Sequence, residues 1–321
     1  MLTTLAGGEG WSLGHFACRA HRHARAVEEY ASAHHIGFVT RGVFVKQVHR
    51  EVNAADPMQA VFFPKGESYR IHHPVEGGDD CIVLTVDDRF LAEASIDPPT
   101  TGLPSGATRL DPKGFFGLAR ITREARLGWD RVRVEEGVCR LFDETMSDCR
   151  GRLATRSPGG PDRVRAVQVL MSAHLDRRLT LRALGRAVGW SPFQLMRGFR
   201  EQTGVPVHRY LTGLRVARAI ARLADGERDL TALALGCGFV DHSHLTNVFR
   251  RHAGVTPSAA RALLAISGRD REAEVGGVPR GGDLAAWRQP QETRGPGRGH
   301  RQHFIDRQPG EPDGQADRPV E

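Results

Sequence analysis

The chain is poor in lysine, sparse in cysteine and without a long apolar run. Only three of its 45 basic residues are lysine, so arginine carries nearly all of the positive charge. No apolar run approaches the roughly 20 residues of a membrane-spanning helix, and no basic segment followed by an apolar one marks a secretory signal. The five cysteines are odd in number and lack CxxC spacing, which argues against a disulfide framework. These absences predict a cytoplasmic protein that does not contact a membrane.

The sequence patterns of nucleotide binding and catalysis are also missing. No glycine-rich loop leads from a predicted strand into a helix with a phosphate-binding lysine. The acidic pairs Asp79-Asp80 and Asp87-Asp88 fit turns better than paired acid–base chemistry. We therefore predict that the chain is not an enzyme and needs no cofactor.

The first third of the chain has the pattern of β-structure. Its 321 residues leave room for two domains and unstructured ends. Within residues 1–105, short β-branched or aromatic runs alternate with turn residues, and no helical pattern lies between them. These runs are Ile36–Thr40, Gly42–Lys46, Ala60–Phe63 and Cys81–Val86. Such spacing predicts a small antiparallel barrel or sandwich.

The remaining residues are predicted to be helical or unstructured. Residues 106–156 change to a helical period, from about Pro112 onward, with two apolar stripes for packing in the core or for a dimer face. Residues 157–161, Ser-Pro-Gly-Gly-Pro, are expected to link this part to a helical domain at 162–266. Residues 267–321 hold too few apolar residues to offset their ordering entropy and are expected to be disordered. The predicted fold class is thus α+β with two domains.

Two helix-turn-helix patterns lie about fifty residues apart, at residues 180–199 and 229–249. Each has a capping residue, a short apolar-periodic helix, a glycine turn and a second helix that ends in Phe-Arg. The predicted caps are Thr180, Ser191, Asp229 and Asp241, and the turn glycines are Gly189 and Gly238. One chain with two such units can place two helices in successive major grooves, roughly 34 Å apart.

Positive charge gathers on the same part of the chain. Residues 162–267 contain 16 arginines and seven acidic residues. Arginine is abundant along the whole chain, so this local excess supports DNA binding without establishing it.

With these patterns, residues 162–266 resemble the DNA-binding domain of the AraC/XylS family of bacterial transcription regulators. The matching residues are Leu184-Gly-Arg-Ala-Val-Gly-Trp-Ser191, Leu195, Arg197, Phe199, Gly204, Tyr210, Leu214-Arg-Val-Ala-Arg-Ala219, Ala234, Gly238-Phe239, Ser243, Leu245, Phe249-Arg-Arg251 and Gly254-Val-Thr-Pro257. The resemblance implies seven helices with two recognition helices, and action at promoters, most often as an activator. It also implies that the N-terminal part is a cupin-like β-barrel that senses an effector or mediates dimerisation.

Carried over by position, the resemblance implies six base-contacting residues: Phe193, Met196, Arg197, His242, Thr246 and Asn247. Their chemistry fits, because arginine pairs with guanine, asparagine pairs with adenine and apolar side chains contact the thymine methyl group. Candidate phosphate contacts are Ser191, Arg200, Arg215, Arg218, Ser243, Arg250 and Arg251. Met196 and Asn247 stand where longer polar or basic side chains are usual. Gly185 replaces a better helix former, which predicts a slightly weaker first unit.

Histidines and cysteines of the N-terminal part raise the question of a metal site. Imidazole and thiolate together suit zinc, iron or copper, and the candidate ligands are Cys18, His72, His73 and Cys81. The usual cupin spacing is absent, and the near match His21-Arg-His23 lies before the first clear strand, so no metal is predicted. Two alternatives remain open: a thiol- or metal-responsive regulator, and a metal-dependent cupin oxygenase.

The predicted partners follow from the predicted class of protein. Double-stranded promoter DNA is the first, and RNA polymerase is the second. A small-molecule effector and a second copy of the chain, forming a homodimer, are further candidates.

Overall fold

The computed structural model describes residues 2–19, 26–94, 102–128, 130–152 and 161–264. The predicted tail at 267–321, residues 157–160 of the predicted linker, and His21 and His23 lie outside these residues. Within the described part of the chain, no helix has both the length and the apolar character needed to cross a membrane.

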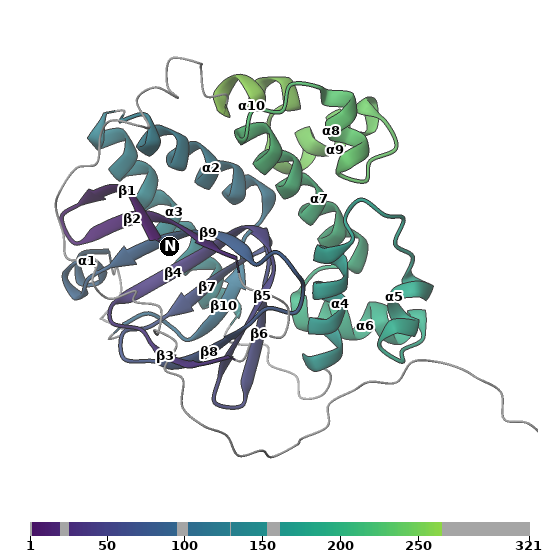
Figure 1. The fold of residues 1–321 in the computed structure, drawn as a ribbon, viewed down its shortest axis with the longest axis horizontal. Helices are drawn as coiled ribbons and strands as arrows, with labels where there is room; N and C mark the ends of the chain where they lie inside the picture. Colours follow the sequence, from purple (N-terminus) through teal and green to yellow (C-terminus); the bar gives the residue numbers. More distant parts are fainter. Residues whose placement is uncertain (1, 20–25, 95–101, 129, 153–160, 265–321) are drawn as a thin grey trace, which may run out of the picture. The chain divides into compact units, whose positions relative to one another are not determined.

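In the described part of the chain, ten strands form two antiparallel sheets, shown in purple and blue in Figure 1. The six-stranded sheet has the order β1-β2-β9-β4-β7-β10, and the four-stranded sheet has the order β3-β8-β5-β6. The bounds are Leu2–Gly8 (β1), Trp11–Cys18 (β2), Glu28–Tyr30 (β3), His34–Gly42 (β4), Phe44–Val48 (β5), Glu51–Ala55 (β6), Gln59–Phe63 (β7), Ser68–His72 (β8), Asp79–Val86 (β9) and Gly106–Arg109 (β10).

The four strands predicted from apolar runs are confirmed as β4, β5, β7 and β9. The prediction that no clear strand precedes His21 was wrong, because β1 and β2 form a hairpin there. The β1 sequence, Leu-Thr-Thr-Leu-Ala-Gly-Gly, has no apolar alternation, since this edge strand is largely exposed. Its pairing with β2 supplies the order that its composition does not indicate.

Alternating side chains divide the six-stranded sheet into two apolar faces. Ile36 and Phe38 of β4 contact one cluster, which includes helices that cover the sheet, and Val39 contacts a second cluster between the two sheets. The covering helices are α2 (Pro112–Arg126) and α3 (Arg131–Arg152). Both faces of this sheet are therefore buried.

The helical segment is confirmed from Pro112, although β10 occupies the first residues of the range predicted to be helical. Asp111 accepts a hydrogen bond from the backbone of Gly114 and caps α2. Phe115 and Leu118 of α2 and Val138 of α3 are almost completely buried within this one chain, so packing in the core accounts for them. A short helix, α1 (Asp88–Ala94), follows β9.

Seven helices follow in residues 161–264, as the resemblance implied, and are drawn in teal to green in Figure 1. They are α4 (Pro161–Ala173), α5 (Leu181–Ala187), α6 (Pro192–Thr203), α7 (Val207–Ala224), α8 (Leu230–Gly236), α9 (His242–Ala253) and α10 (Pro257–Leu264). Helix α7 has 18 residues, about 27 Å of helix, and it contacts both the first helix pair, α5–α6, and the second, α8–α9.

Candidate nucleic-acid interface

The first helix-turn-helix unit has the caps that its sequence predicts. Thr180 accepts a hydrogen bond from the backbone N–H of Ala183 at 3.1 Å. The Ser191 hydroxyl accepts from the N–H of Gln194 at 3.2 Å, and the Gln194 side chain accepts from the N–H of Ser191 at 2.9 Å. This reciprocal pair satisfies two backbone donors at the start of α6 and fixes where that helix begins.

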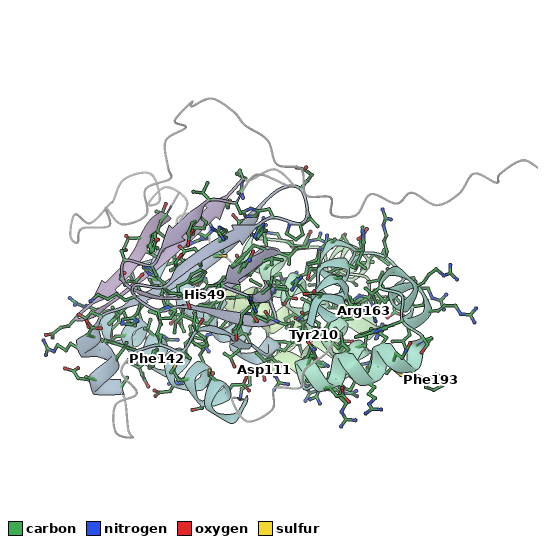
Figure 2. All side chains as sticks on the ribbon, turned by 90° about the horizontal axis from the view of Figure 1, so that it is seen from below. His49, Asp111, Phe142, Arg163, Phe193 and Tyr210 are labelled. Atoms are coloured by element: carbon green, nitrogen blue, oxygen red, sulfur yellow. The ribbon has the colours of Figure 1, made fainter. Side chains whose placement is uncertain are left out.

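Helix α6 separates its apolar core side from a solvent-exposed side. Leu195 and Phe199 are fully buried, whereas Phe193 is 79% exposed and Met196 is 40% exposed. Figure 2 shows Phe193 at the outer margin of this helix. Phe193 and Met196 lie with Leu181 around one surface hollow, and a contiguous exposed apolar patch of this kind favours contact with a partner molecule.

Arg197 lies on the same exposed side of α6. Its guanidinium Nε donates to Glu201 Oε1 at 2.9 Å, one helical turn away. The side chains of Arg197 and Glu201 are 84% and 48% exposed, so this ion pair contributes little to stability. Arg197 can therefore exchange Glu201 for another acceptor at small cost.

The glycine at position 185 has a packing role. Its carbonyl accepts a hydrogen bond from the N–H of Trp190 at 2.8 Å. A Cβ atom at Gly185 would lie 2.5 Å from the carbonyl oxygen of Trp190. The expectation that Gly185 weakens the first unit is thus incomplete, because the close approach of the turn requires a residue without a side chain.

The second unit repeats the arrangement with different side chains. Asp229 caps α8 by accepting from Thr231 and Ala232, and Asp241 caps α9 by accepting from His244 at 2.7 Å. Gly238 forms the turn with φ +79°.

The outer side of α9 carries the three residues proposed to contact bases in this unit. His242 and Asn247 are exposed, and Thr246 is half-buried. Leu245 and Phe249 are fully buried on the opposite side of the helix. The second recognition helix therefore presents polar side chains where the first presents apolar ones.

Arg215 of α7 connects the two units. Its Nε donates to the carbonyl of Leu175 at 3.2 Å, and its Nη2 donates to the carbonyl of Arg177 at 2.9 Å. A Cβ atom at Gly238 would lie 2.2 Å from that same Leu175 carbonyl oxygen. The entry to the first unit, the joining helix and the turn of the second unit therefore pack against one another.

The predicted phosphate-contacting residues differ in their surroundings. Arg200, Ser243, Arg250 and Arg251 are exposed, and Arg218 is half-buried. Ser191 uses its hydroxyl to cap α6. The contacts of Arg215 give it a structural role, and its contact with phosphate stays a prediction.

Known proteins match this part of the chain. Residues 184–262 match a family model described as a helix-turn-helix domain. The chain is 33% identical over 115 residues to the transcriptional activator RhaR of Klebsiella pneumoniae, covering 35% of this chain and 41% of RhaR. It is 31% identical over 192 residues to the regulator RipA of Corynebacterium glutamicum, covering 57% of each chain.

Residues 184–262 form an AraC-type helix-turn-helix domain. The chain spans about two fifths of the length of RhaR and 57% of RipA. A crystal structure of ToxT from Vibrio cholerae is 14% identical to this chain, with a TM-score of 0.33, and the match covers 81% of this chain and 100% of ToxT.

The helix-turn-helix domain contacts the β-rich part through a buried carboxylate. Asp56, between β6 and β7, accepts hydrogen bonds from the Tyr210 hydroxyl at 2.7 Å and from the N–H of Met58 at 2.9 Å. Tyr210 also accepts from Gln168 at 2.9 Å. Burial raises the pKa of Asp56 to about 6, although its hydrogen bonds oppose that rise. Figure 2 shows Tyr210 in the interior, in contrast to Phe193.

Nothing in the sequence singles out Asp56. It precedes Pro57 in an Asp-Pro dipeptide that is typical of turns, and the pattern predicts only a turn there. Its partner Tyr210 lies 154 residues away in the sequence. Only the fold brings the two side chains together.

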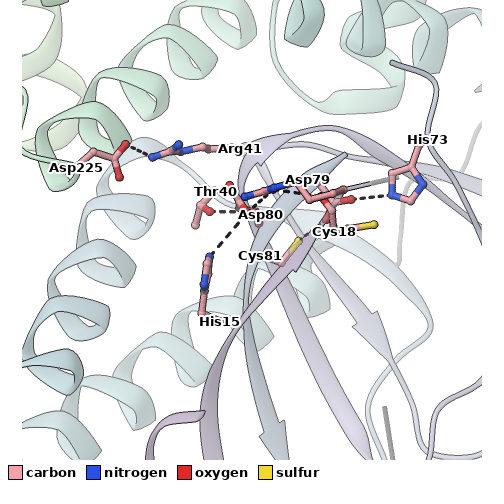
Figure 3. Close-up of polar contacts among 10 residues, drawn as sticks. His15, Cys18, Thr40, Arg41, His73, Asp79, Asp80, Cys81 and Asp225 are labelled. Carbon is pink, nitrogen blue, oxygen red and sulfur yellow. Dashed lines mark hydrogen bonds and ion pairs between the residues drawn. The ribbon is translucent and has the colours of Figure 1, made fainter. Parts of the chain in front are cut away.

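The structure places the four candidate metal ligands in two different settings. His72 lies 3.1 Å from Gln47 and takes no part in a cluster. Cys18 and His73 lie next to Asp79, and the ligand atoms of the three residues are within 4.8 Å of one another. Asp79 is the first residue of β9, whereas its sequence pattern predicts a turn. Cys81 donates to Asp79 at 3.1 Å. Figure 3 shows these residues where the ends of β2 and β9 meet His73.

Proposed function

We propose that this chain is a sequence-specific DNA-binding regulator of transcription, acting as an activator on promoter DNA. In this proposal the helix-turn-helix domain binds DNA, and the β-rich part senses an effector or mediates dimerisation. The single observation that supports it best is the pair of exposed helix sides, on α6 and α9, that are held through the shared α7. RNA polymerase is the second proposed partner, because promoter activation requires it.

We assign the base contacts to the outer sides of α6 and α9. Arg197 has the bidentate geometry for guanine, and Asn247 has that for adenine. Phe193 and Met196 are suited to thymine methyl groups, while His242 and Thr246 complete the second helix. Arg200, Arg250 and Arg251 supply phosphate contacts that position the protein without distinguishing sequences.

A hollow between the β-rich part and the helices is the proposed effector site. It has a volume of about 300 Å³, which is at the lower end of small-molecule sites. Ile82, Phe115 and Leu118 give it apolar walls. Its charged lining has an excess of positive charge, with four arginines (Arg19, Arg41, Arg123 and Arg126) against the two carboxylates of Asp80 and Asp225. This lining favours a small effector that is apolar and carries negative charge.

Selection of bound duplexes from a random library by the purified full-length protein tests the proposal. We expect a bipartite consensus whose two parts lie about 10 base pairs apart, because two recognition helices occupy successive major grooves. Affinity for the selected duplex should fall steeply between low and physiological salt, since arginine–phosphate contacts release counterions. Failure to enrich any sequence would contradict sequence-specific binding.

Single substitutions assign each half of the selected site to one helix. Arg197→Ala and Asn247→Ala should each cost about 1–3 kcal/mol of specific binding, and each should relax a different half of the consensus. Arg140→Ala removes an exposed arginine that pairs with Glu136 on α3, so it changes charge equally without touching either helix. If Arg197→Ala left affinity and base preference like those of Arg140→Ala, the assignment of α6 would be wrong.

A second candidate keeps the class of protein and changes its signal. The meeting of Cys18, His73 and Asp79 favours a thiol- or metal-responsive regulator. A cupin oxygenase receives no comparable support, and the relatives reported above bear the names of transcription regulators.

A further inference from the structure

Four potential metal ligands gather at one end of the two sheets. Cys18 is the last residue of β2 and pairs with Asp79, the first residue of β9. His73 directly follows β8 of the other sheet, and Cys81 lies two residues after Asp79 on the same strand. The ligand atoms therefore come from three segments whose positions are fixed by strand pairing.

The distances among these atoms are close to those of a metal site. The ligand atoms of Cys18, His73 and Asp79 all lie within 4.8 Å of one another. His73 Nε2 lies 2.8 Å from Asp79 Oδ1, and Cys81 Sγ lies 3.1 Å from Asp79 Oδ2. Bonds of roughly 2.0–2.3 Å place the ligands of a tetrahedral zinc site roughly 3.3–3.8 Å apart. The atoms of Cys18, His73 and Asp79 are thus within about 1.5 Å of that spacing, and Cys81 joins them through its contact with Asp79.

The surroundings of the cluster favour occupation by a cation. The side chains of His73 and Asp79 are 10% and 3% exposed, so their polar atoms are largely removed from water. Two thiols, one imidazole and one carboxylate form a ligand set that selects zinc-like ions over calcium or magnesium. Ordinary hydrogen bonding explains the His73–Asp79 contact, but it does not require two sulfur atoms at the same carboxylate.

We propose that Cys18, His73, Asp79 and Cys81 bind one divalent ion of the zinc class, and that this ion alters DNA affinity. The second half of this inference rests on the proposed function, whereas the first half does not. The ion would join β8 of the smaller sheet to β2 and β9 of the larger one. The free-thiol form and the metal-bound form then differ in how firmly these strand ends are held.

A short series of contacts connects the cluster to the helix-turn-helix domain (Figure 3). Asp80 follows the ligand Asp79, its carbonyl accepts from the Thr40 hydroxyl at 3.0 Å, and it pairs in register with Arg41. Arg41 forms a half-exposed ion pair with Asp225, the C-cap residue directly after α7. Because α7 joins the two recognition helices, a shift of the β9 end is transmitted to the helix that sets their spacing.

Metal titration of the full-length protein tests the site directly. The protein is reduced, stripped with a chelator and titrated with Zn²⁺, and Co²⁺ serves as a spectroscopic probe of thiolate ligation. We expect one ion per chain and sulfur-to-cobalt charge-transfer absorption. Cys18→Ser and His73→Gln should each weaken Zn²⁺ binding at least about 100-fold, the upper end of what loss of an outer-sphere partner costs.

Two matched variants control for general effects of cysteine and histidine loss. His72→Gln changes the neighbouring histidine, which contacts Gln47, and Cys139→Ser changes an exposed cysteine on α3. Both should bind Zn²⁺ like the unchanged protein. Absence of stoichiometric metal, or equal binding by Cys18→Ser and Cys139→Ser, would overturn the site. Thermal melts of all four variants identify any loss of binding that is due to unfolding.

DNA affinity with and without Zn²⁺ then tests the coupling. We expect a change of at least about fivefold, typical of allosteric coupling, and its loss in Cys18→Ser and in Arg41→Gln. Metal binding without any change in DNA affinity would overturn the coupling. Failure of both metal-free and metal-loaded protein to select DNA would instead overturn the proposed function and leave the site intact.

Discussion

The two helix-turn-helix units share one plan but are connected to the rest of the molecule differently. The second unit belongs to a single large apolar cluster that also contains α2, α3 and the six-stranded sheet. The first unit has a smaller cluster of its own, to which the β-rich part contributes Met58. It also contacts the β-rich part through the polar network of Asp56, Tyr210 and Gln168.

The two kinds of contact should hold the two units to the β-rich part with different firmness. Apolar packing over a continuous core involves no titratable group and therefore responds little to pH. A buried carboxylate with a raised pKa changes its charge near neutral pH, and burying that charge carries a free-energy cost. We therefore expect the first unit, with α6, to be the more easily displaced of the two.

The largest expected effect comes from removing one buried aromatic side chain from each of the two apolar clusters. Phe199→Ala and Phe249→Ala both remove a fully buried ring and should each cost about 3–5 kcal/mol of stability. In native-state hydrogen exchange, Phe199→Ala should lower protection in α4–α6 alone. Phe249→Ala should lower protection in α8–α10 and in α2 together, because they share one cluster. Identical protection patterns for the two variants would abolish the distinction between the units.

The next largest effect is the pH dependence of the free energy of unfolding that comes from Asp56. Its pKa is raised from 3.8 to about 6 in the folded protein, so the folded state binds the proton more tightly than the unfolded state does. Stability from this group is therefore greatest below about pH 4 and is lost as the pH rises through about 6. The loss is about 3 kcal/mol at full burial.

Asp56→Asn isolates this group from the other carboxylates. The amide keeps an oxygen to accept from Tyr210 but does not ionise in this range. Subtracting the unfolding free energy of the variant from that of the unchanged protein cancels all other titrations. The difference should change by about 2 kcal/mol between about pH 4 and about pH 7, which is most of the full change, because the unfolded carboxyl is already partly ionised at pH 4. A difference that stays constant across this range would show that Asp56 does not control the contact.

The smallest expected effect concerns the exposed side of α6. Glu201 pairs with Arg197, and its negative charge faces the proposed DNA surface. Glu201→Gln should raise DNA affinity roughly two- to fivefold, about 0.5–1 kcal/mol, because it frees Arg197 and removes repulsion from phosphate. Glu136→Gln removes an exposed, arginine-paired carboxylate from α3 and should leave affinity unchanged. Equal responses of the two variants would indicate a general charge effect.

Local features of the helix-turn-helix domain could be predicted residue by residue. The caps at Thr180, Ser191, Asp229 and Asp241 are confirmed, because a capping side chain needs only backbone groups two or three residues away. Phe199 and Phe249 each lie four residues after a leucine, a spacing that places the pair on one side of a helix, and both are buried. Such features depend on short sequence separations that the sequence itself displays.

The β-rich part could be predicted less completely. Four strands with apolar runs were found, whereas the other six described strands were missed. The central strand β2 is among these six, and so is the edge strand β1, whose order comes from pairing with β2 and not from its composition. The cluster around Asp79 was only partly anticipated. His72 and His73 are equivalent in sequence, and only the path of the chain after β8 turns one of them toward Cys18.

The sequence by itself determined the doubled helix-turn-helix plan, where its helices begin, and which sides of them face water. The tertiary structure alone decided that Arg215 joins the two units, that Asp56 is buried against Tyr210, and that Cys18, His73 and Asp79 meet. The physical reason is the range of the interactions. Capping and helical periodicity act within one or two helical turns. The contacts of Arg215 and of Asp56 join residues 38 and 154 positions apart, and the cluster of Cys18, His73 and Asp79 joins the ends of separate strands.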